Sequence, residues 1–389
     1  FAATFDASGA VDMVASEANA RVAMVSILFI VIAIIFGFAV YRRNVPMGIA
    51  SVIGVGAIVA IIVIGLNFHP IYLSSKTWMW IVGIYITIAS VAPVWILLQP
   101  RDYLSSFLLY AMLALASVAV VIGRPSLDTL PVLNTVGNTT PVFPVLFTTI
   151  ACGAISGFHS LVSSGTTSKQ LDKETDAKPI AYGGMLLECV LAIMTLVATA
   201  YAYSLKGTEF ALTGATAIFG GGIAGMIDPS RGGLYTTLYT LLVLTYSAFC
   251  LTSLDTATRL ARFMFQEFWL DGSKGETPEN VTGYKKTLTN PYVATLITVF
   301  LGVMLGLNGY AKIWALFGSA NQLLAALGLL AVATWLGNIG KDNKMFLLPM
   351  GFMLCVTIAS LAINTKTQMG LISAGGADWG PYVQAILGV

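Results

Sequence analysis

Long runs of apolar residues recur along the chain and are separated by short polar stretches. Ten of these runs approach the length of about 20 mostly apolar residues that a helix needs to cross a lipid bilayer. The predicted spans are residues 21–41, 47–66, 78–99, 104–122, 143–165, 180–205, 234–256, 290–307, 311–335 and 346–364. The pattern therefore predicts an all-α polytopic membrane protein with about ten transmembrane helices.

Two stretches depart from this pattern. Residues 206–233 contain "ATAIFGGGIAGMIDPSRGG", which is too short and too rich in glycine to span and predicts a re-entrant or interfacial piece. Residues 257–289 open with "ATRLARFMFQEFWL", where basic and aromatic side chains alternate at helical spacing. That pattern fits a helix lying in the inner membrane surface, and it fits an exposed connector helix equally well.

The composition supports a membrane protein and excludes several function classes. Charged residues make up 10% of the chain, whereas a soluble globular protein carries roughly 25%. The net charge of +2 and the absence of a basic cluster give no indication of a nucleic-acid partner. The four cysteines lie in apolar runs without C-x-x-C spacing, and the two histidines form no H-E-x-x-H motif. We therefore expect no cofactor and no metal site.

The distribution of Lys and Arg predicts the orientation, because these residues collect in cytoplasmic loops. With residues 1–20 outside, thirteen basic residues lie inside and seven outside. The inside set is Arg42, Arg43, Arg101, Lys169, Lys173, Lys178, Arg259, Arg262, Lys274, Lys285, Lys286, Lys341 and Lys344. We accordingly expect an extracytoplasmic segment at 1–20 and a transmembrane domain at 21–377. The start at Phe1 and the apolar end "PYVQAILGV" predict a piece of a longer chain, with 378–389 beginning a further segment.

The stretch "CGAISGFHSLVSSGTTSKQL", residues 152–171, places glycines, hydroxyls and a histidine in a predicted span. Irregular backbone survives in a bilayer only where protein or a water-filled cavity shields it, so we expect the helix to unwind at Gly157 to Gly165 around a binding site. The candidate residues are Gly157, His159, Ser160, Ser163, Ser164, Gly165, Thr166 and Thr167. Close helix packing explains the glycines but not the run of hydroxyls. His159 is then either a carrier of a coupling proton or a histidine bonded to a neighbouring carbonyl.

Two acidic residues lie within predicted spans. Glu188 in the sixth span is expected to be protonated, paired or directed into a cavity, as a second proton carrier or in an ion pair. Asp255 is followed four residues later by Arg259, which favours an ion pair on the helix surface. The alternative is an ion site that Asp255 shares with Thr252 and Ser253.

Buried amides and a proline provide the last candidates. Asn321 and Gln322 near the middle of the ninth span fit either interhelical hydrogen bonds or substrate contact. Pro93 removes a backbone donor and frees the carbonyl of Ala89, which predicts a kink near Ser90. The sharper alternative is a second half-helix that lines the same cavity.

Four segments together resemble the carbon starvation protein A family of bacterial inner-membrane transporters. They are "PVWILLQPRDYLSSFLLY" (93–110), "ACGAISGFHSLVSSGTTSKQLDKETDAKPIAYGGMLLE" (151–188), "LTSLDTATRLARF" (251–263) and "WALFGSANQLLAAL" (314–327). The resemblance implies the inverted-repeat fold of the amino acid–polyamine–organocation (LeuT-like) transporters. The Gly-His-His stretch of typical members has no match here, which implies that N-terminal helices of the first repeat are missing.

The resemblance also implies a function. It points to a secondary transporter that imports peptides during carbon starvation, coupled to protons or to sodium, and in related members to a pyruvate/proton symporter. The partners are then a small-molecule substrate, the coupling ion and membrane lipid. Two other classes were weighed against transport: a starvation sensor that does not transport, and an intramembrane serine hydrolase using Ser160 or Ser164 with His159. No G-x-S-x-G elbow supports the hydrolase.

Overall fold

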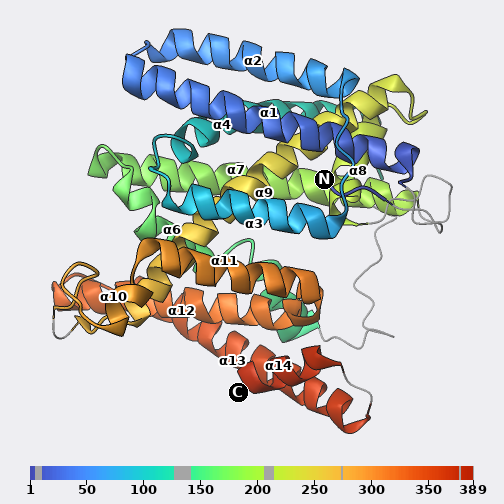
Figure 1. The fold of residues 1–389 in the computed structure, drawn as a ribbon. Helices are drawn as coiled ribbons and strands as arrows, with labels where there is room; N and C mark the ends of the chain where they lie inside the picture. The colour runs from blue at the N-terminus through green and yellow to red at the C-terminus, as the bar shows by residue number, and fades with distance from the viewer. Residues whose placement is uncertain (5–10, 127–141, 206–213, 273–274, 376–377, 389) are drawn as a thin grey trace. The chain divides into compact units, whose positions relative to one another are not determined.

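The computed structural model describes residues 1–4, 11–126, 142–205, 214–272, 275–375 and 378–388. The described part is helical and contains no β-strand element, which confirms the all-α prediction. The α-helices are α1 (Met13–Arg43), α2 (Met47–Asn67), α3 (Ser75–Val91), α4 (Leu98–Gly123), α5 (Phe147–Ala151), α6 (Gly157–Gly165), α7 (Ala177–Ser204), α8 (Ala215–Ile227), α9 (Gly233–Phe268), α10 (Tyr284–Leu288), α11 (Pro291–Asn308), α12 (Trp314–Asn338), α13 (Lys344–Ser373) and α14 (Trp379–Leu387) (Figure 1).

Eight helices in the described part are long and apolar enough to cross a membrane. They are α1, α2, α4, α7, α9, α11, α12 and α13, and each coincides with one of the ten predicted spans. In the other two predicted spans the structure has shorter helices. The span at 78–99 corresponds to α3, which ends at Val91, and the span at 143–165 is divided into α5 and α6.

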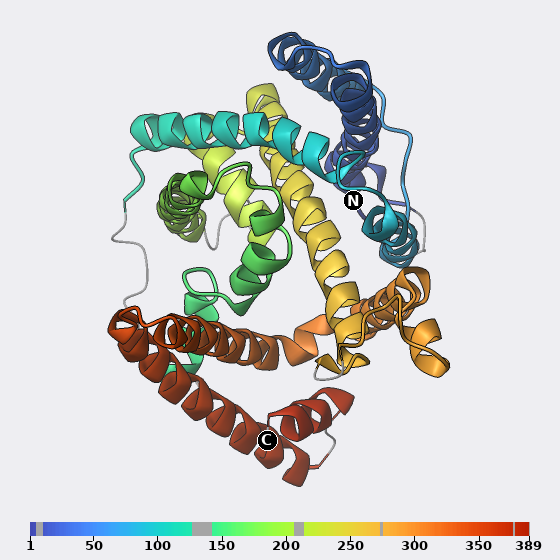
Figure 2. The same ribbon diagram turned by 90° about the vertical axis from the view of Figure 1, so that its left-hand side faces the viewer.

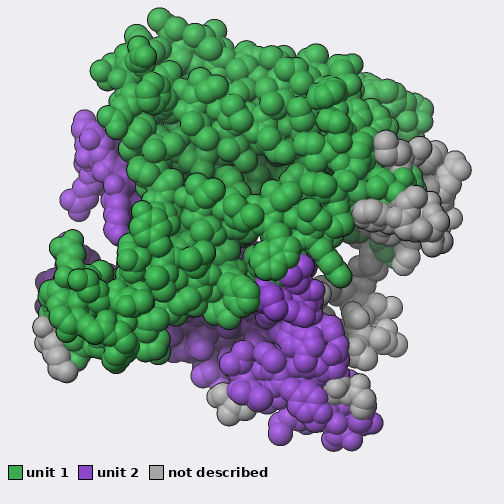
Figure 3. Space-filling view, in the orientation of Figure 1, with its two compact units in different colours: residues 1–131, 178–303 green, residues 132–177, 304–389 purple. Residues whose placement is uncertain are grey.

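The chain forms two compact units, coloured in Figure 3, and each is described by itself. Unit 1 comprises residues 1–131 and 178–303, and unit 2 comprises residues 132–177 and 304–389. Unit 1 therefore holds α1 to α4 and α7 to α10, together with α11 as far as Val303. Unit 2 holds α5, α6 and α12 to α14.

Helix α9 organises unit 1, because α1, α3, α4 and α8 all pack against it. Figure 2 shows it running obliquely past α4 and α8. Its 36 residues extend for about 54 Å, well beyond the roughly 30 Å of a hydrocarbon core. The prediction of a separate connector or interfacial helix from residue 257 is therefore wrong. Residues Thr258, Leu260, Arg262 and Gln266 continue α9 and are buried within the unit.

Two apolar clusters hold unit 1 together. One joins α1 and α2 to α4 and α9 through residues such as Phe29, Ile58 and Leu104. The other joins α4, α7, α8 and α9. Helix α8 is buried from Phe219 to Met226, so the glycine-rich stretch forms a short regular helix inside unit 1, and its re-entrant or interfacial placement stays a prediction. Its glycines permit close approach, since a Cβ atom on Gly222 would lie 2.7 Å from the carbonyl oxygen of Ala198.

Unit 2 is built on α12, which packs against α13 and also contacts α5 and α6. Hydroxyl groups lie at the contacts of α13 with α12 and α5. The Ser360 hydroxyl lies 2.9 Å from that of Ser319 and 3.1 Å from that of Thr148, which links α13 to α12 and α5. Helix α14 packs on α13 through an amide hydrogen bond from Asn364 to Gln384. Hydrogen bonds between these polar side chains thus link the helices of the unit.

Candidate functional site

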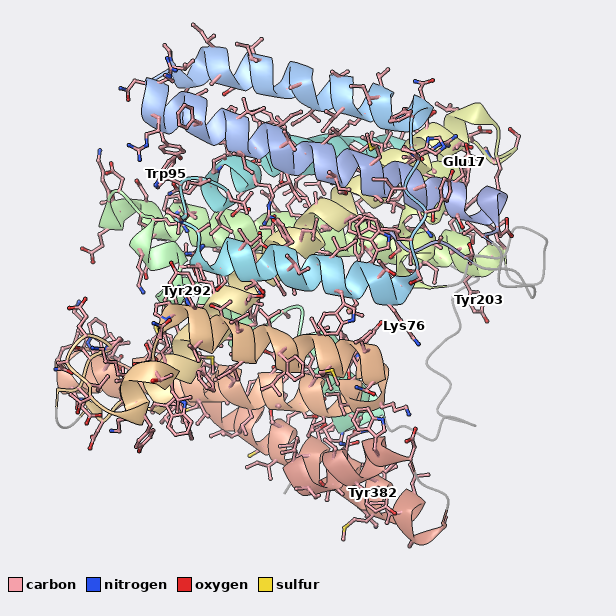
Figure 4. All side chains as sticks on the ribbon, in the orientation of Figure 1. Glu17, Lys76, Trp95, Tyr203, Tyr292 and Tyr382 are labelled. Atoms are coloured by element: carbon pink, nitrogen blue, oxygen red, sulfur yellow. The ribbon has the colours of Figure 1, made fainter. Side chains whose placement is uncertain are left out.

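The connection between α3 and α4, residues 92–97, interrupts two apolar helices inside unit 1. Helix α3 ends at Val91 because Pro93 lacks an N–H group, and Ala92 takes the extended backbone typical of a residue before proline. Figure 4 labels Trp95 in this connection, where Arg42 at the end of α1 lies 5.0 Å from the centre of its indole ring. Instead of the predicted kink near Ser90 within one continuous span, the helix ends at Val91.

Two arginines of α9 bind the carbonyl groups that this break exposes. The Nη2 atom of Arg259 donates to the carbonyl oxygens of Ala89 and Ala92, at 2.9 and 3.0 Å. The Nη1 atom of Arg262 donates to the carbonyl of Ser90, also at 2.9 Å. The carbonyl of Ala89 is thus free of the helix ladder, as expected from Pro93, and positive charge lies at the negative end of the α3 dipole.

A buried ion pair lies beside this break. The Nη1 atom of Arg101 on α4 lies 2.5 Å from the Oδ2 atom of Asp255 on α9, and the two side chains are 1% and 3% exposed. The hydroxyl of Tyr85 on α3 donates to the same carboxylate oxygen at 2.8 Å and accepts a hydrogen bond from Arg101. These three side chains join α3, α4 and α9 through one charged network.

The expected surface pair between Asp255 and Arg259 is therefore wrong. Asp255 faces Arg101 across the helix interface, and Arg259 is directed to the end of α3. The alternative ion site also fails in part, because Ser253 lies on the exposed side of α9. Thr252 instead faces Asp102 of α4. No group of three or more His, Cys, Asp or Glu side chains that could hold a metal ion is found in the described ranges.

Three of the basic residues that predicted the orientation belong to this region of unit 1. Arg101, Arg259 and Arg262 were counted among the inside loop residues, but all three lie in helices and bind protein groups. They therefore carry no information about loop charge. The seven outside residues include Arg231 and Lys312, which lie at helix connections. Without these three arginines, the excess of Lys and Arg in the inside loops over the outside loops is smaller.

In unit 2 the predicted interruption exists, but it lies earlier than expected. Helix α5 ends at Ala151, and α6 is a regular helix from Gly157 to Gly165. The expected unwinding of residues 157–165 is therefore wrong, and the irregular backbone is at 152–156. The serine hydroxyls of α6 bind carbonyl groups of their own helix and do not hold the backbone in an unwound conformation. Ser160 donates to the carbonyl of Gly157, and both Ser163 and Ser164 donate to that of Ser160.

Asn321 of α12 holds the start of α6. Its Oδ1 atom accepts from the backbone N–H of Phe158 at 2.9 Å, and its Nδ2 atom donates to Ser156 at 2.8 Å and to the sulfur of Cys152 at 3.0 Å. The N-cap Ser156 hydroxyl also accepts from this N–H at 3.2 Å, so Ser156 and Asn321 together cap the helix N-terminus. Of the two expectations for Asn321, interhelical hydrogen bonding is the one that its contacts support.

Gly157 lies at the same junction. A Cβ atom at this position would lie 2.5 Å from the carbonyl oxygen of Asn321 and 2.5 Å from Cβ of Leu324. Glycine is therefore needed for the close approach of α6 to α12. Gln322, the neighbour of Asn321, is fully buried, and neither atom of its amide has a hydrogen-bond partner among the described residues.

The remaining candidates lie in different surroundings. His159 is exposed on α6, Thr167 is exposed just beyond it, and Thr166 is buried between them. Glu188 is exposed on α7, so the structure places no buried ion pair or cavity around it. Ser90 is buried, with its hydroxyl 3.4 Å from that of Thr295. Ser90, Thr252 and Asp255 belong to unit 1, whereas His159 and Asn321 belong to unit 2, so a cavity shared by all of them stays a prediction.

Arg101 and Tyr85 are the residues that the sequence argument missed. The predicted span ends at residue 99, just before Pro100, and therefore places Arg101 in a loop. Proline is tolerated in the first turn of a helix, and Pro100 lies in the first turn of α4. A helix start before Pro100 would have placed Arg101 inside the membrane, where a charge requires a partner.

A family model described as carbon starvation protein CstA matches residues 7–206 and 202–360. The chain belongs to this family. Among its relatives, the peptide transporter CstA of Bacillus subtilis is 31% identical over 80% of this chain and 59% of the relative. The peptide transporter CstA of Escherichia coli is 34% identical over 76% of this chain and 51% of the relative. The pyruvate/proton symporter BtsT of Escherichia coli is 30% identical over 85% of this chain and 58% of the relative.

The chain thus spans about half to three-fifths of the length of these CstA-family relatives. No solved structure matches it. Together, the eight apolar helices and the transporter relatives identify a multi-pass membrane protein, consistent with the bacterial inner membrane.

Proposed function

We propose that the chain forms part of a secondary active transporter that imports peptides across the bacterial inner membrane. Membership of the CstA family carries this proposal, since relatives over 30% identical along most of the chain are named peptide transporters. We further propose that import responds to carbon starvation, and that the complete protein has the inverted-repeat fold with about ten spans in this part of it.

The transport core in this proposal is the α3–α4 break of unit 1. Discontinuous helices in transporters provide free backbone groups beside a substrate, and here arginines already occupy the freed carbonyls. The Arg101–Asp255 pair joins α4 to α9 beside this break, and in this proposal the two helices shift relative to each other as access alternates. A charged network of this kind can exchange partners between states, because each group needs an opposite charge in both.

Proton coupling is assigned in the proposal to His159. An imidazole can take up and release a proton, and this side chain is exposed on α6. Asp255 is less suited in this conformation, because its carboxylate is paired with Arg101. Glu188 is the second candidate, and sodium is the alternative coupling ion.

A second substrate class follows from one comparison, because the BtsT relative is named a pyruvate/proton symporter. Peptides and pyruvate share a carboxylate. The serine hydrolase alternative loses support, since the Ser160 hydroxyl donates to the carbonyl of Gly157 in its own helix. His159 is the adjacent residue, and adjacent side chains on a helix do not face each other. The sensor that does not transport has no feature of the chain in its favour.

Uptake into proteoliposomes tests the proposal with the full-length protein that contains this chain. A labelled dipeptide and labelled pyruvate are supplied with and without an inward proton gradient. Wild type is compared with His159→Gln and with His69→Gln, a control histidine at the end of α2 that lies near Glu17. We expect dipeptide accumulation that requires the gradient, and loss of that requirement only in His159→Gln.

Other outcomes assign other functions. Accumulation of pyruvate alone would replace the peptide assignment with the symporter. Gradient-dependent uptake that His159→Gln leaves unchanged would move the proton to Glu188 or Asp255. Absence of uptake for both substrates would contradict transport of either class.

A further inference from the structure

Asp102, near the start of α4, carries a carboxyl group with which no arginine or lysine of the described residues forms an ion pair. The guanidinium of its neighbour Arg101 is bound to Asp255 on α9 instead. The Oδ1 atom of Asp102 is buried and has no hydrogen-bond partner in the described part of the chain. The residue as a whole is only partly buried, so its carboxyl group is not sealed from water. An unpaired carboxylate in a membrane span is costly, and a bound proton removes its charge.

The hydroxyl of Thr252 on α9 faces this carboxyl group. Three other threonines of the same helix, Thr240, Thr245 and Thr258, each donate to the carbonyl group four residues earlier. The Oγ1 atom of Thr252 is buried, and it has no such partner among the residues that the structure describes. Its hydroxyl is therefore available to bind another side chain.

Asp255 provides the third unpartnered oxygen atom. Its Oδ2 atom binds Arg101 and Tyr85, whereas its Oδ1 atom is buried without a partner within the described ranges. Thr252 and Asp255 are three residues apart on α9 and so share a helix face. With both carboxyl groups ionised, only the Thr252 hydroxyl carries a hydrogen atom for the two carboxylate oxygens. One of these oxygens then stays without a donor, which is rare for a buried polar atom.

The charged groups that act on Asp102 are Arg101 on its own helix and Asp255 on α9. Tyr85 of α3 and Arg259 of α9 enter this set through Asp255. Helices α1 and α8 also pack against α4, and no charged side chain described on them acts on Asp102. Asp102 therefore lies between one guanidinium, which is already paired, and a second carboxylate.

We propose that Asp102 is a proton-binding site linked to the buried ion pair through Thr252. With a proton on Oδ1, Asp102 donates to the Thr252 hydroxyl, and the Thr252 hydroxyl donates to Oδ1 of Asp255. One proton thereby gives all three oxygen atoms a partner. Water on the partly exposed side supplies and accepts this proton, and no other bond forms or breaks. The site is additional to the one proposed for His159.

Release of the proton changes the balance around Arg101. The two carboxylates, Asp102 and Asp255, then compete for one guanidinium, which weakens the contact between α4 and α9. This consequence rests on the proposed function, in which these two helices shift as access alternates. The existence of the proton site does not rest on it.

Infrared difference spectroscopy tests the site without substrate. The full-length protein is compared at neutral and at mildly acidic pH, and the carbonyl band of a protonated carboxyl group is followed. We expect such a band to appear on acidification, to move to lower frequency when aspartate is labelled with ¹³C at the side-chain carboxyl, and to be lost in Asp102→Asn. Glu276→Gln is the control, because Lys285 pairs with that carboxylate at 2.6 Å.

Threonine variants test the hydrogen bond. Thr252→Val keeps the shape of the side chain but removes the group that accepts from protonated Asp102, so the carbonyl band should shift to higher frequency. Thr258→Val is the matched control on α9, because this hydroxyl donates to the carbonyl of Leu254, and its band should match wild type. The comparison remains decisive even if Asp102→Asn fails to fold.

Three results would overturn the site. They are a wild-type spectrum without an aspartic acid band, a band that Asp102→Asn retains and Asp255→Asn loses, and a band that Thr252→Val leaves unshifted. The role in transport is tested separately, since Asp102→Asn cannot release a proton and should lose dipeptide uptake into proteoliposomes. Wild-type uptake in that variant would exclude Asp102 from the transport cycle, and absence of uptake in the wild type would contradict the proposed function while the infrared result stands.

Discussion

The Nη1 atom of Arg101 lies 2.5 Å from the Oδ2 atom of Asp255, and this contact joins two helices that are 154 residues apart in sequence at these positions. Both side chains are almost completely buried. Taking either charge out of water is expensive, and the cost is offset only while the other charge remains beside it. The stability of unit 1 should therefore depend on the two residues jointly.

Asp255→Asn tests this dependence. The variant keeps the size of the side chain but leaves Arg101 with an uncompensated buried charge, so we expect a loss of about 3–5 kcal/mol in unfolding free energy. Chemical unfolding in detergent, followed by tryptophan fluorescence, measures it. The double variant Arg101→Gln/Asp255→Asn should recover a large part of the loss, since both charges are then absent.

The control for this pair is Glu17→Gln. Glu17 pairs with Arg21 at 2.6 Å on a partly exposed surface, where an ion pair contributes about 0–1 kcal/mol. Equal losses in Glu17→Gln and Asp255→Asn would contradict the special cost of burial at Asp255.

Arg259→Lys separates hydrogen-bond geometry from charge. Lysine keeps the positive charge, but its shorter side chain and more strongly hydrated ammonium are less able to reach both carbonyls, to which the single Nη2 atom of Arg259 donates. We expect a loss of about 1–2 kcal/mol from one buried carbonyl left unpaired. The same unfolding assay checks it, with Arg42→Lys as the control at a guanidinium that lies over an indole ring. Wild-type stability of Arg259→Lys would mean that charge alone is sufficient at the end of α3.

Gly157→Ala tests the contact between α6 and α12. The added methyl group would lie 2.5 Å from protein atoms of α12, so the helices must separate at a cost of about 1–3 kcal/mol. Gly153→Ala is the matched control, because its nearest neighbour would be at an ordinary 3.7 Å. In thermal unfolding experiments, we expect the unfolding midpoint to fall for Gly157→Ala and to stay at the wild-type value for Gly153→Ala. Similar midpoints for the two variants would contradict the close packing at Gly157.

Asp228, outside the spans, makes part of the stability depend on pH. The hydrogen bond from the Ser230 hydroxyl, helped by the N–H groups of Tyr235 and Gly232 at the start of α9, lowers the pKa of this carboxyl from 3.8. Because the folded pKa lies below the unfolded one, the contribution is present above that value and is lost as pH falls through the folded pKa. Asp228→Asn should therefore unfold at a lower temperature than wild type at neutral pH.

The same comparison in acid provides the control for Asp228. The difference in unfolding midpoint between Asp228→Asn and wild type should disappear below the folded pKa, where the wild-type carboxyl is also neutral. A difference that stays constant from neutral pH into strong acid would show that the hydrogen bonds, and not the charge of Asp228, stabilise this turn.

The sequence alone was sufficient for local features of the chain. Runs of apolar residues located α1, α2 and the other long helices, because a spanning helix satisfies its own backbone and needs only length and hydrophobicity. Pro93 predicted a disturbance of the helix near Ser90 and the free carbonyl of Ala89, since proline acts on the backbone four residues away. The long motifs around Pro93 and His159 also indicated the family, which the family model confirms.

The partners of the buried polar groups were decided only by the tertiary structure. Local spacing favoured Arg259 for Asp255, but packing of α4 against α9 brought Arg101 to the carboxylate and left Arg259 to the end of α3. The hydroxyls of 157–165 suggested unwinding, yet they bond to their own helix, and Asn321 from α12 sets where that helix begins. Hydrophobic length is a property of one segment, whereas a charge inside a membrane takes whichever opposite group the packing of distant helices places beside it.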